Sequence, residues 1–192
     1  MEAIAGYGYG KVGRSPVTLA ELRQLEQATG WDAADATTLR RIGDLIGNDA
    51  EALVDGWRTV IGAQPELARW FIGPDGHPDE NYKARVKKRF VQWVHDICFK
   101  PHDQAWLDYQ DEIGKRHTPD KKNETDSAAT PPVVPLRYLL AFSAVVITSI
   151  RGFLQARGAA DADLAQLQQS WTRAVLLEIA LWSRPYAEEG LW

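Results

Sequence analysis

The chain has 192 residues, of which 45% are hydrophobic and 25% charged, and these proportions exclude a disordered chain, a collagen-like repeat and a disulfide scaffold. A net charge of −4 gives no electrostatic attraction to nucleic acid or an anionic membrane, and a single cysteine cannot form an intramolecular disulfide. We therefore expect one domain over residues 1–192, no nucleic-acid or membrane partner and a cytoplasmic location, because the N-terminus lacks an export-signal pattern.

The chain begins with a glycine-rich segment, residues 1–17, which predicts a loop. Thr18 and Glu21 then form a capping-box pattern that opens a helix to about Ala28. Residues 65–71 predict a short helical turn, and residues 74–78 predict a turn. Apolar residues at helical spacing predict the other helices: after Asp32, from near Asn48, over 79–97, after Pro101 to His117, over 134–155, and from Leu164 to before Pro185.

Two segments differ in composition from the rest of the chain, one by being strongly apolar and the other by being strongly polar. The apolar stretch between Arg137 and Arg151 is too short to cross a bilayer and predicts a buried core helix. The polar stretch from Thr118 to about Pro132 is longer than most connections in compact proteins, and such loops are usually functional or mobile. No strand pattern and no long repeat is found, so the fold class is all-α. The aromatic stripes can be core alone or can enclose a flat hydrophobic cofactor.

The four histidines give the main clue to metal chemistry. None is spaced with another as in a multi-ligand zinc or iron site. Haem iron needs only one protein ligand, because its macrocycle supplies the equatorial ligands. His117 has the position for that role, at the end of an apolar helix face beside a loop, but a surface histidine at a helix C-terminus fits the same spacing. His77 and His102 lie in or beside turns, where we expect them at the surface.

Other side chains also have both a structural and a functional interpretation. The basic run from Lys83 to Arg89 is a solvated helix face, or it supplies contacts to phosphate or to haem propionates. Cys98 is expected to be a small buried hydrophobic residue rather than a reactive thiol. Four aromatic residues are expected in the core, or in the wall of a cofactor site: Trp57, Phe90, Trp93 and Phe142.

Several motifs, in order along nearly the entire chain, resemble those of the protoglobin family. The most specific is WLDYQDEIGKRH, from Trp106 to His117, followed by KKNETD at 121–126. The supporting motifs are GYGYG at 6–10, PDG at 74–76, Arg89-Phe90 with Trp93, RYL at 137–139 with Phe142, and LWSRPY at 181–186.

The resemblance implies a three-over-three globin fold with an added N-terminal segment, residues 1–17, and a b-type haem ligated by His117. It further implies that the N-terminal loop covers the haem propionates and that Arg89 pairs with a propionate. Three residues would line the distal side, with Trp93 as a further contact: Trp57, Phe90 and Phe142.

One position departs from the family pattern. Better-known members have Trp-Tyr where this chain has Trp57 and Arg58, so the distal tyrosine that could donate to bound oxygen is replaced. Arg58 either takes over as a donor or turns toward a propionate or solvent, and an inward guanidinium would need an anionic or polar partner because burying an unpaired charge is costly.

The resulting hypothesis is a haem protein that reversibly binds O2, CO or NO at an open position opposite His117. The alternatives are a haem-dependent redox enzyme (an NO dioxygenase, a nitrite reductase or a peroxidase-like enzyme), a gas sensor acting through a partner protein, and a cofactor-free helical interaction module. A homodimer through the last two helices is a further expectation, because their apolar faces are broad.

Overall fold

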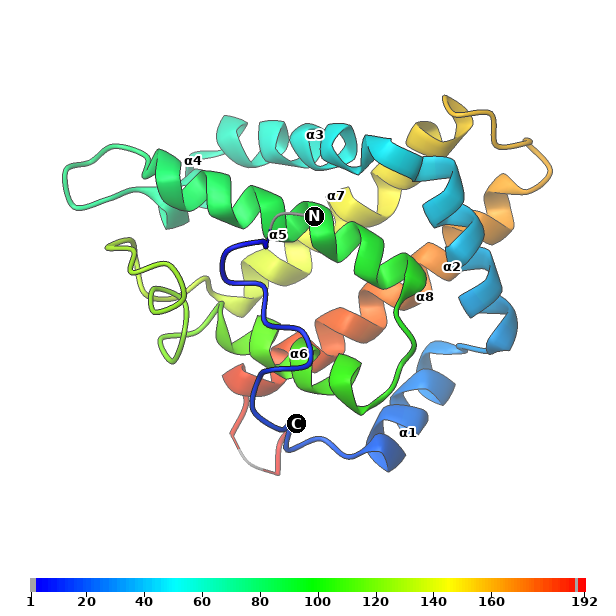
Figure 1. Cartoon of the computed structure of the whole chain (residues 1–192), viewed down its shortest axis with the longest axis horizontal. Helices are drawn as coiled ribbons and strands as arrows, with labels where there is room; N and C mark the ends of the chain where they lie inside the picture. The colour runs from blue at the N-terminus through cyan, green and yellow to red at the C-terminus, as the bar shows by residue number, and fades with distance from the viewer. Residues whose placement is uncertain (1–2, 189) are drawn as a thin grey trace.

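The computed structural model describes residues 3–188 and 190–192 (Figure 1). Within these residues the chain forms helices, turns and loops, and no strand is present beyond one isolated bridge between Ile72 and Pro78. The predicted all-α class is confirmed. The helices are α1 (Leu19–Thr29), α2 (Ala33–Ile46), α3 (Ala50–Ala63), α4 (Pro65–Ala68), α5 (Glu80–Phe99), α6 (Gln104–Lys115), α7 (Leu136–Gln155) and α8 (Leu164–Ser183), with 3₁₀ turns at Gly47–Asp49, Arg69–Phe71 and Arg184–Tyr186.

The first two helices begin where side chains satisfy the free N–H groups of the first turn. The Thr18 hydroxyl accepts from the Glu21 backbone N–H (3.2 Å), and the Glu21 carboxylate accepts from the Thr18 N–H (2.7 Å). Asp32 and Asp35 form the same reciprocal box at the start of α2. Gly30 ends α1 in the left-handed conformation, at φ 72°, which favours glycine.

The longer helices cross one another in a globin-like arrangement, as the resemblance implied. Helix α8 packs along α7 and also contacts α6, α2 and α1, while α5 packs on α2 and α3. Figure 1 shows α3 and α5 running across one side of the molecule and α6 and α8 crossing below them. Hydrogen bonds from Arg85 to Asp126 and from Arg89 to Ala5 attach the polar loop after α6 and the segment before α1 to α5.

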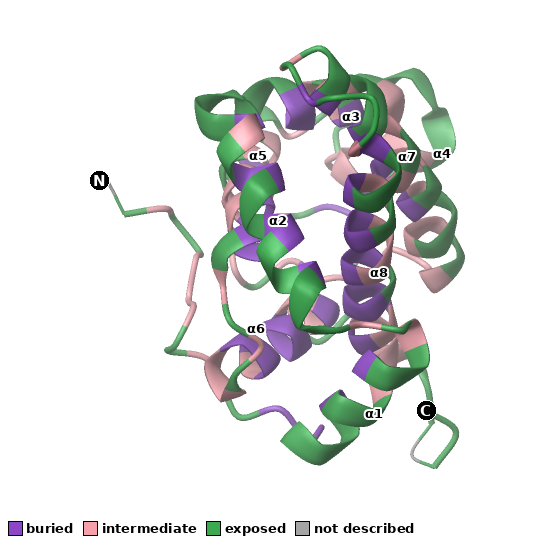
Figure 2. Cartoon of the chain, turned by 90° about the vertical axis from the view of Figure 1, so that its right-hand side faces the viewer, coloured by how far each residue is buried: buried purple, intermediate pink, exposed green. Residues whose placement is uncertain are grey.

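The core divides into a large and a small cluster of buried side chains. The large cluster is centred on three indoles, with ring centroids 6.1 Å apart for Trp57–Trp93 and for Trp93–Trp171. The small cluster, which includes Leu22, Trp106, Leu107 and Leu177, attaches α1 to α6 and α8. Figure 2 shows buried residues along the length of α8, which contributes to both clusters.

Helix α7 differs from its prediction as a buried core helix. It buries only one face, with Ser143, Val146, Ile150 and Leu154, while Leu140 on another face is 50% exposed. It is also longer than the apolar stretch that predicts it. Within the described residues it is the one helix whose length and composition would suffice to cross a membrane, with a mean hydropathy of 1.4 and 22% of that window buried.

Candidate functional site

A cavity of about 690 Å³ lies between α3, α5, α6, α7, α8 and the loops that follow α4 and α6. This volume is in the range of binding sites for small molecules and cofactors. Its walls are mostly apolar and include flat aromatic faces. Representative wall residues are Val86, Phe90, Trp93, Ile113, Phe142 and Trp182. The aromatic stripes in the sequence therefore surround a cavity as well as forming the core.

His117 contributes an imidazole to the wall of this cavity. Helix α6 ends at Lys115, two residues earlier than predicted, and the His117 backbone continues the turn by donating to the Gly114 carbonyl (3.0 Å). Its Nδ1 lies 2.8 Å from the Ile113 carbonyl oxygen, which can only accept, so the proton is assigned to Nδ1 and Nε2 keeps its lone pair. Burial lowers the pKa of His117 to about 4, which keeps the ring neutral at pH 7.

Contacts from the end of α8 hold the backbone at His117 in place. The Tyr186 hydroxyl lies 3.1 Å from the His117 carbonyl oxygen and 2.6 Å from that of Val134. The His117 ring lies nearly parallel to Trp182, with centroids 6.1 Å apart. A side chain at Gly114 would place its Cβ 3.1 Å from the Trp182 backbone, which is tighter than an ordinary contact, so glycine favours the close approach of α6 to α8.

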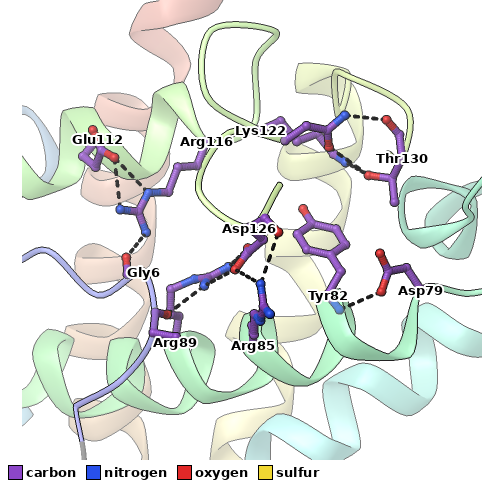
Figure 3. Close-up of polar contacts among 12 residues, drawn as sticks. Gly6, Asp79, Tyr82, Arg85, Arg89, Glu112, Arg116, Lys122, Asp126 and Thr130 are labelled. Carbon is purple, nitrogen blue, oxygen red and sulfur yellow. Dashed lines mark hydrogen bonds and ion pairs between the residues drawn. The ribbon is translucent and has the colours of Figure 1, made fainter. Parts of the chain in front are cut away.

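Arg89 lies at the edge of the cavity, in an ion pair with a buried carboxylate (Figure 3). Its guanidinium donates to both Asp126 carboxylate oxygens, at 3.0 and 2.5 Å, and the Asp126 side chain is only 2% exposed. Arg85 donates to the Asp126 backbone oxygen at 3.1 Å. The polar loop after α6 is therefore tied to α5 by charge-assisted hydrogen bonds.

Two arginines that line the cavity also bind the N-terminal segment. Arg89 donates to the Ala5 carbonyl (2.9 Å), and Arg116 donates to the Gly6 carbonyl (2.7 Å) and pairs with Glu112 (3.0 Å). Gly6 has φ 75°, and a Cβ there would lie 2.6 Å from the Arg89 guanidinium. The segment before α1 is thus held beside the cavity edge.

Lys122 contributes a buried cation to the same cavity. It is 3% exposed, and its ammonium donates to the Trp70 carbonyl (3.0 Å) and the Thr130 hydroxyl (2.7 Å). Burial lowers its pKa to about 8. In the part of the chain that the structure describes, it has no carboxylate within 4.0 Å. The indole N–H of Trp70, another wall residue, is also buried and has no acceptor among these residues.

The residues predicted for the distal side separate into two groups. Phe90, Phe142, Trp93 and Arg58 line the cavity, whereas Trp57 does not. Trp57 lies behind Phe90, with ring centroids 5.1 Å apart, because its indole N–H donates to the Ser149 hydroxyl (2.7 Å). It therefore supports the wall from the core instead of forming its surface.

Arg58 is paired on the solvent side. Its guanidinium lies 3.5 Å from the Asp55 carboxylate, which also binds Lys87 at 2.8 Å. The Arg58 side chain is 29% exposed and that of Asp55 is 48% exposed, so this pair lies at the rim of the cavity. The structure thus gives Arg58 an anionic partner at the cavity rim.

Several cavity residues were not predicted from the sequence, among them Trp70, Tyr82 and Tyr138. Lys122 lies in the KKNETD motif of the polar loop, and that motif was the available signal for it. His102 was predicted at the surface, and this was wrong. Its side chain is 11% exposed and stacks on Trp106 (4.0 Å), while its Nδ1 lies 2.7 Å from the Glu26 carboxylate. Cys98 is buried as predicted, and burial raises the pKa of its thiol.

The cavity suits a flat apolar group that carries acidic substituents. Among the described residues no three His, Cys, Asp or Glu side chains come together to hold a metal ion, so a metal at His117 would have to bring most of its own ligands. Haem does so, and the cavity wall includes N–H donors, at Lys122, Trp70, Arg89 and Arg116, of the kind that suits its carboxylates. The donor set and the apolar walls therefore fit a haem.

A comparison with models of known protein families finds a match. The family model for protoglobins matches residues 18–192, which include all the helices and all the cavity residues named above. A search of curated proteins finds no match. Because the match covers nearly the whole chain, the protein belongs to the protoglobin family.

Proposed function

We propose that this protoglobin carries a b-type haem whose iron is ligated by His117, and that it reversibly binds O2, CO or NO. Membership of the family implies a haem globin. The observation that carries the proposal is a neutral imidazole in the wall of a cavity of about 690 Å³, with Nδ1 held by the Ile113 carbonyl and Nε2 free to bind a metal.

The residues around His117 orient it for this task. The Nδ1–H bond to Ile113 fixes the tautomer and the ring plane, and it raises the basicity of Nε2. The contacts of Tyr186 and Gly114 fix the backbone that carries the ring. When bound, haem iron supplies an open position for a diatomic gas. The aromatic side chains of Phe90 and Phe142 keep water away from that position.

The opposite side of the cavity has little hydrogen bonding to offer a bound gas. The indole N–H of Trp57 is committed to Ser149, and the Arg58 guanidinium is committed to Asp55. A gas on this side of the cavity would therefore meet mainly apolar side chains.

We further propose that two copies of the chain pair through the outer faces of α7 and α8. Leu140 on α7 is 50% exposed and Leu176 on α8 is 45% exposed, and both helices carry broad apolar faces. A cytoplasmic location is also proposed, for which the single cysteine, unpaired and buried, is the support. Sedimentation of wild type and of L140E with L176E tests the pairing, with a dimer expected for the former only.

The test of the main proposal is spectroscopic. The protein is purified with haem supplied, reduced, and recorded under argon, O2, CO and NO. We expect a Soret band that shifts with each gas, and we expect His117→Ala to lose the five-coordinate ferrous spectrum. His77→Ala, at an exposed histidine outside the cavity, is the matched control. A wild-type protein without a Soret band, or the same spectra in His117→Ala, would contradict the proposal.

A further inference from the structure

The cations that line the cavity differ in whether they already have an acidic partner. Lys122 is the one among them for which the described residues supply no carboxylate within 4.0 Å. The others are each paired: Arg58 with Asp55, Lys83 with Glu80, Lys87 with Glu51 and Asp55, Arg89 with Asp126, and Arg116 with Glu112.

The environment of Lys122 lacks a counter-charge. An ammonium has three N–H donors, and two of them reach the neutral oxygens of Trp70 and Thr130. The ammonium also lies 5.2 Å from the centre of the Tyr82 ring, which is a weaker partner than an anion. A buried charge is costly unless it is paired. An anionic group would therefore stabilise Lys122 by accepting its third N–H and by balancing its positive charge.

Trp70 provides a second and independent observation. Its indole N–H is buried without an acceptor among the described residues, although buried polar groups are almost always bonded. Trp70 and Lys122 both line the cavity and touch each other through the Trp70 carbonyl. A group with acidic oxygens at this end of the cavity could satisfy both donors.

We propose that Lys122 and the Trp70 indole N–H form a binding site for one haem propionate, separate from the Arg89 and Asp126 pair. In Figure 3 Asp126 and Tyr82 lie between Arg89 and Lys122, so the two cations serve different parts of the cavity edge. Arg89 is already bound to Asp126 through two oxygens and to Ala5, so its main role is to fasten the loop and the N-terminal segment. The inference rests on the proposed function, since it presumes that haem enters the cavity.

A purely structural role for Lys122 is the competing explanation. In a purely structural role, Lys122 would need only its hydrogen bonds to the Trp70 carbonyl and the Thr130 hydroxyl. A glutamine amide could donate to these oxygens without carrying a charge. Lys122→Gln therefore separates the two roles. Lys121→Gln is the matched control, because that neighbouring lysine is 38% exposed and is paired with Glu112.

The experiment measures how fast haem leaves the protein for excess apomyoglobin. Each variant is loaded with haem or with haem whose two propionates are methyl esters. In wild type and Lys121→Gln we expect esterification to speed the transfer about a hundredfold, since charge-assisted hydrogen bonds are lost. In Lys122→Gln we expect native haem to leave about tenfold faster and esterification to add about tenfold less than in wild type.

The outcomes distinguish the possible failures. If Lys122→Gln speeds the loss of native haem and of esterified haem equally, Lys122 has a structural role and the inference is overturned. Rates of haem loss that equal those of wild type would also overturn it. Trp70→Phe, which removes the indole N–H donor but keeps an aromatic ring, is the second variant and is decisive if Lys122→Gln does not fold. It should also reduce the effect of esterification, and an unreduced effect would overturn the inference. A wild-type protein that takes up no haem would instead refute the proposed function.

Discussion

Glu178 offers a quantitative test of how the core around Trp93 is organised. It lies on α8, is 2% exposed, and accepts a hydrogen bond from the Trp93 indole. No cation lies within 4.0 Å of its carboxylate in the described part of the chain. Burial raises the pKa of Glu178 from 4.5 to about 8, so the carboxyl group is protonated in the folded protein at pH 7.

The sign and size of the effect follow from this shift. Between pH 4.5 and 8 the folded state holds a proton that the unfolded state has lost, so the free energy of unfolding falls as pH rises. Each unit of pKa difference corresponds to about 1.4 kcal/mol, so this one group removes roughly 3 kcal/mol of stability between pH 5 and pH 8. Glu178→Gln keeps the side-chain volume and an oxygen acceptor for Trp93 but does not titrate.

The assay is urea unfolding of wild type and Glu178→Gln at pH 5, 6, 7 and 8. We expect the stability of the variant relative to wild type to rise with pH, by roughly 3 kcal/mol over the range. Glu124→Gln, at an exposed carboxylate, should follow wild type at every pH. A difference between Glu178→Gln and wild type that does not vary with pH would refute the reasoning.

Three further substitutions test other parts of the account. Gly114→Ala should cost about 1–3 kcal/mol in urea unfolding and speed haem loss, since its Cβ would press on the Trp182 backbone; unchanged haem loss would contradict the close approach. Asp126→Asn should cost roughly 3 kcal/mol, because Arg89 loses its buried partner, and should hasten proteolysis of the N-terminal segment; a cost near zero would contradict that pairing. Arg58→Tyr should slow oxygen dissociation by about tenfold in stopped flow, if the phenol donates to bound oxygen; an unchanged rate would show that position 58 does not face the gas.

The helices could be predicted from the sequence because their signals are local. The capping box at Thr18 acts within a few residues, so the predicted bounds of the first helix were close to those of α1. The burial of α7 could not be predicted in the same way. An apolar helix leaves one face exposed when its neighbours cover only the other, and that depends on tertiary packing.

The candidate site was predicted only where residues on one helix or motif carry it. Helical spacing predicted Phe90 and Trp93 on one helix face, and the family motifs associated them with His117. The structure shows all three at the cavity. The position of Trp57 behind Phe90 depends on Ser149, a residue 92 positions away, and no local pattern reports such a bond.

The burial of two loop residues, Lys122 and His102, also depends on contacts with distant parts of the chain. Lys122 lies in a polar loop that resembles a solvated segment, and its burial results from contacts with Trp70 and Thr130. His102 was predicted at the surface from its place beside a proline, but its environment is built by Trp106 and Glu26.

The most direct test of the central claim, that His117 holds the haem iron, replaces this side chain and then supplies its chemistry from solution. The absorption spectrum of the reduced protein is recorded for wild type and for His117→Gly, with and without added imidazole. The account predicts that His117→Gly loses the five-coordinate ferrous spectrum and that imidazole restores it, together with CO binding. A His117→Gly protein whose ferrous spectrum equals that of wild type without imidazole would contradict it.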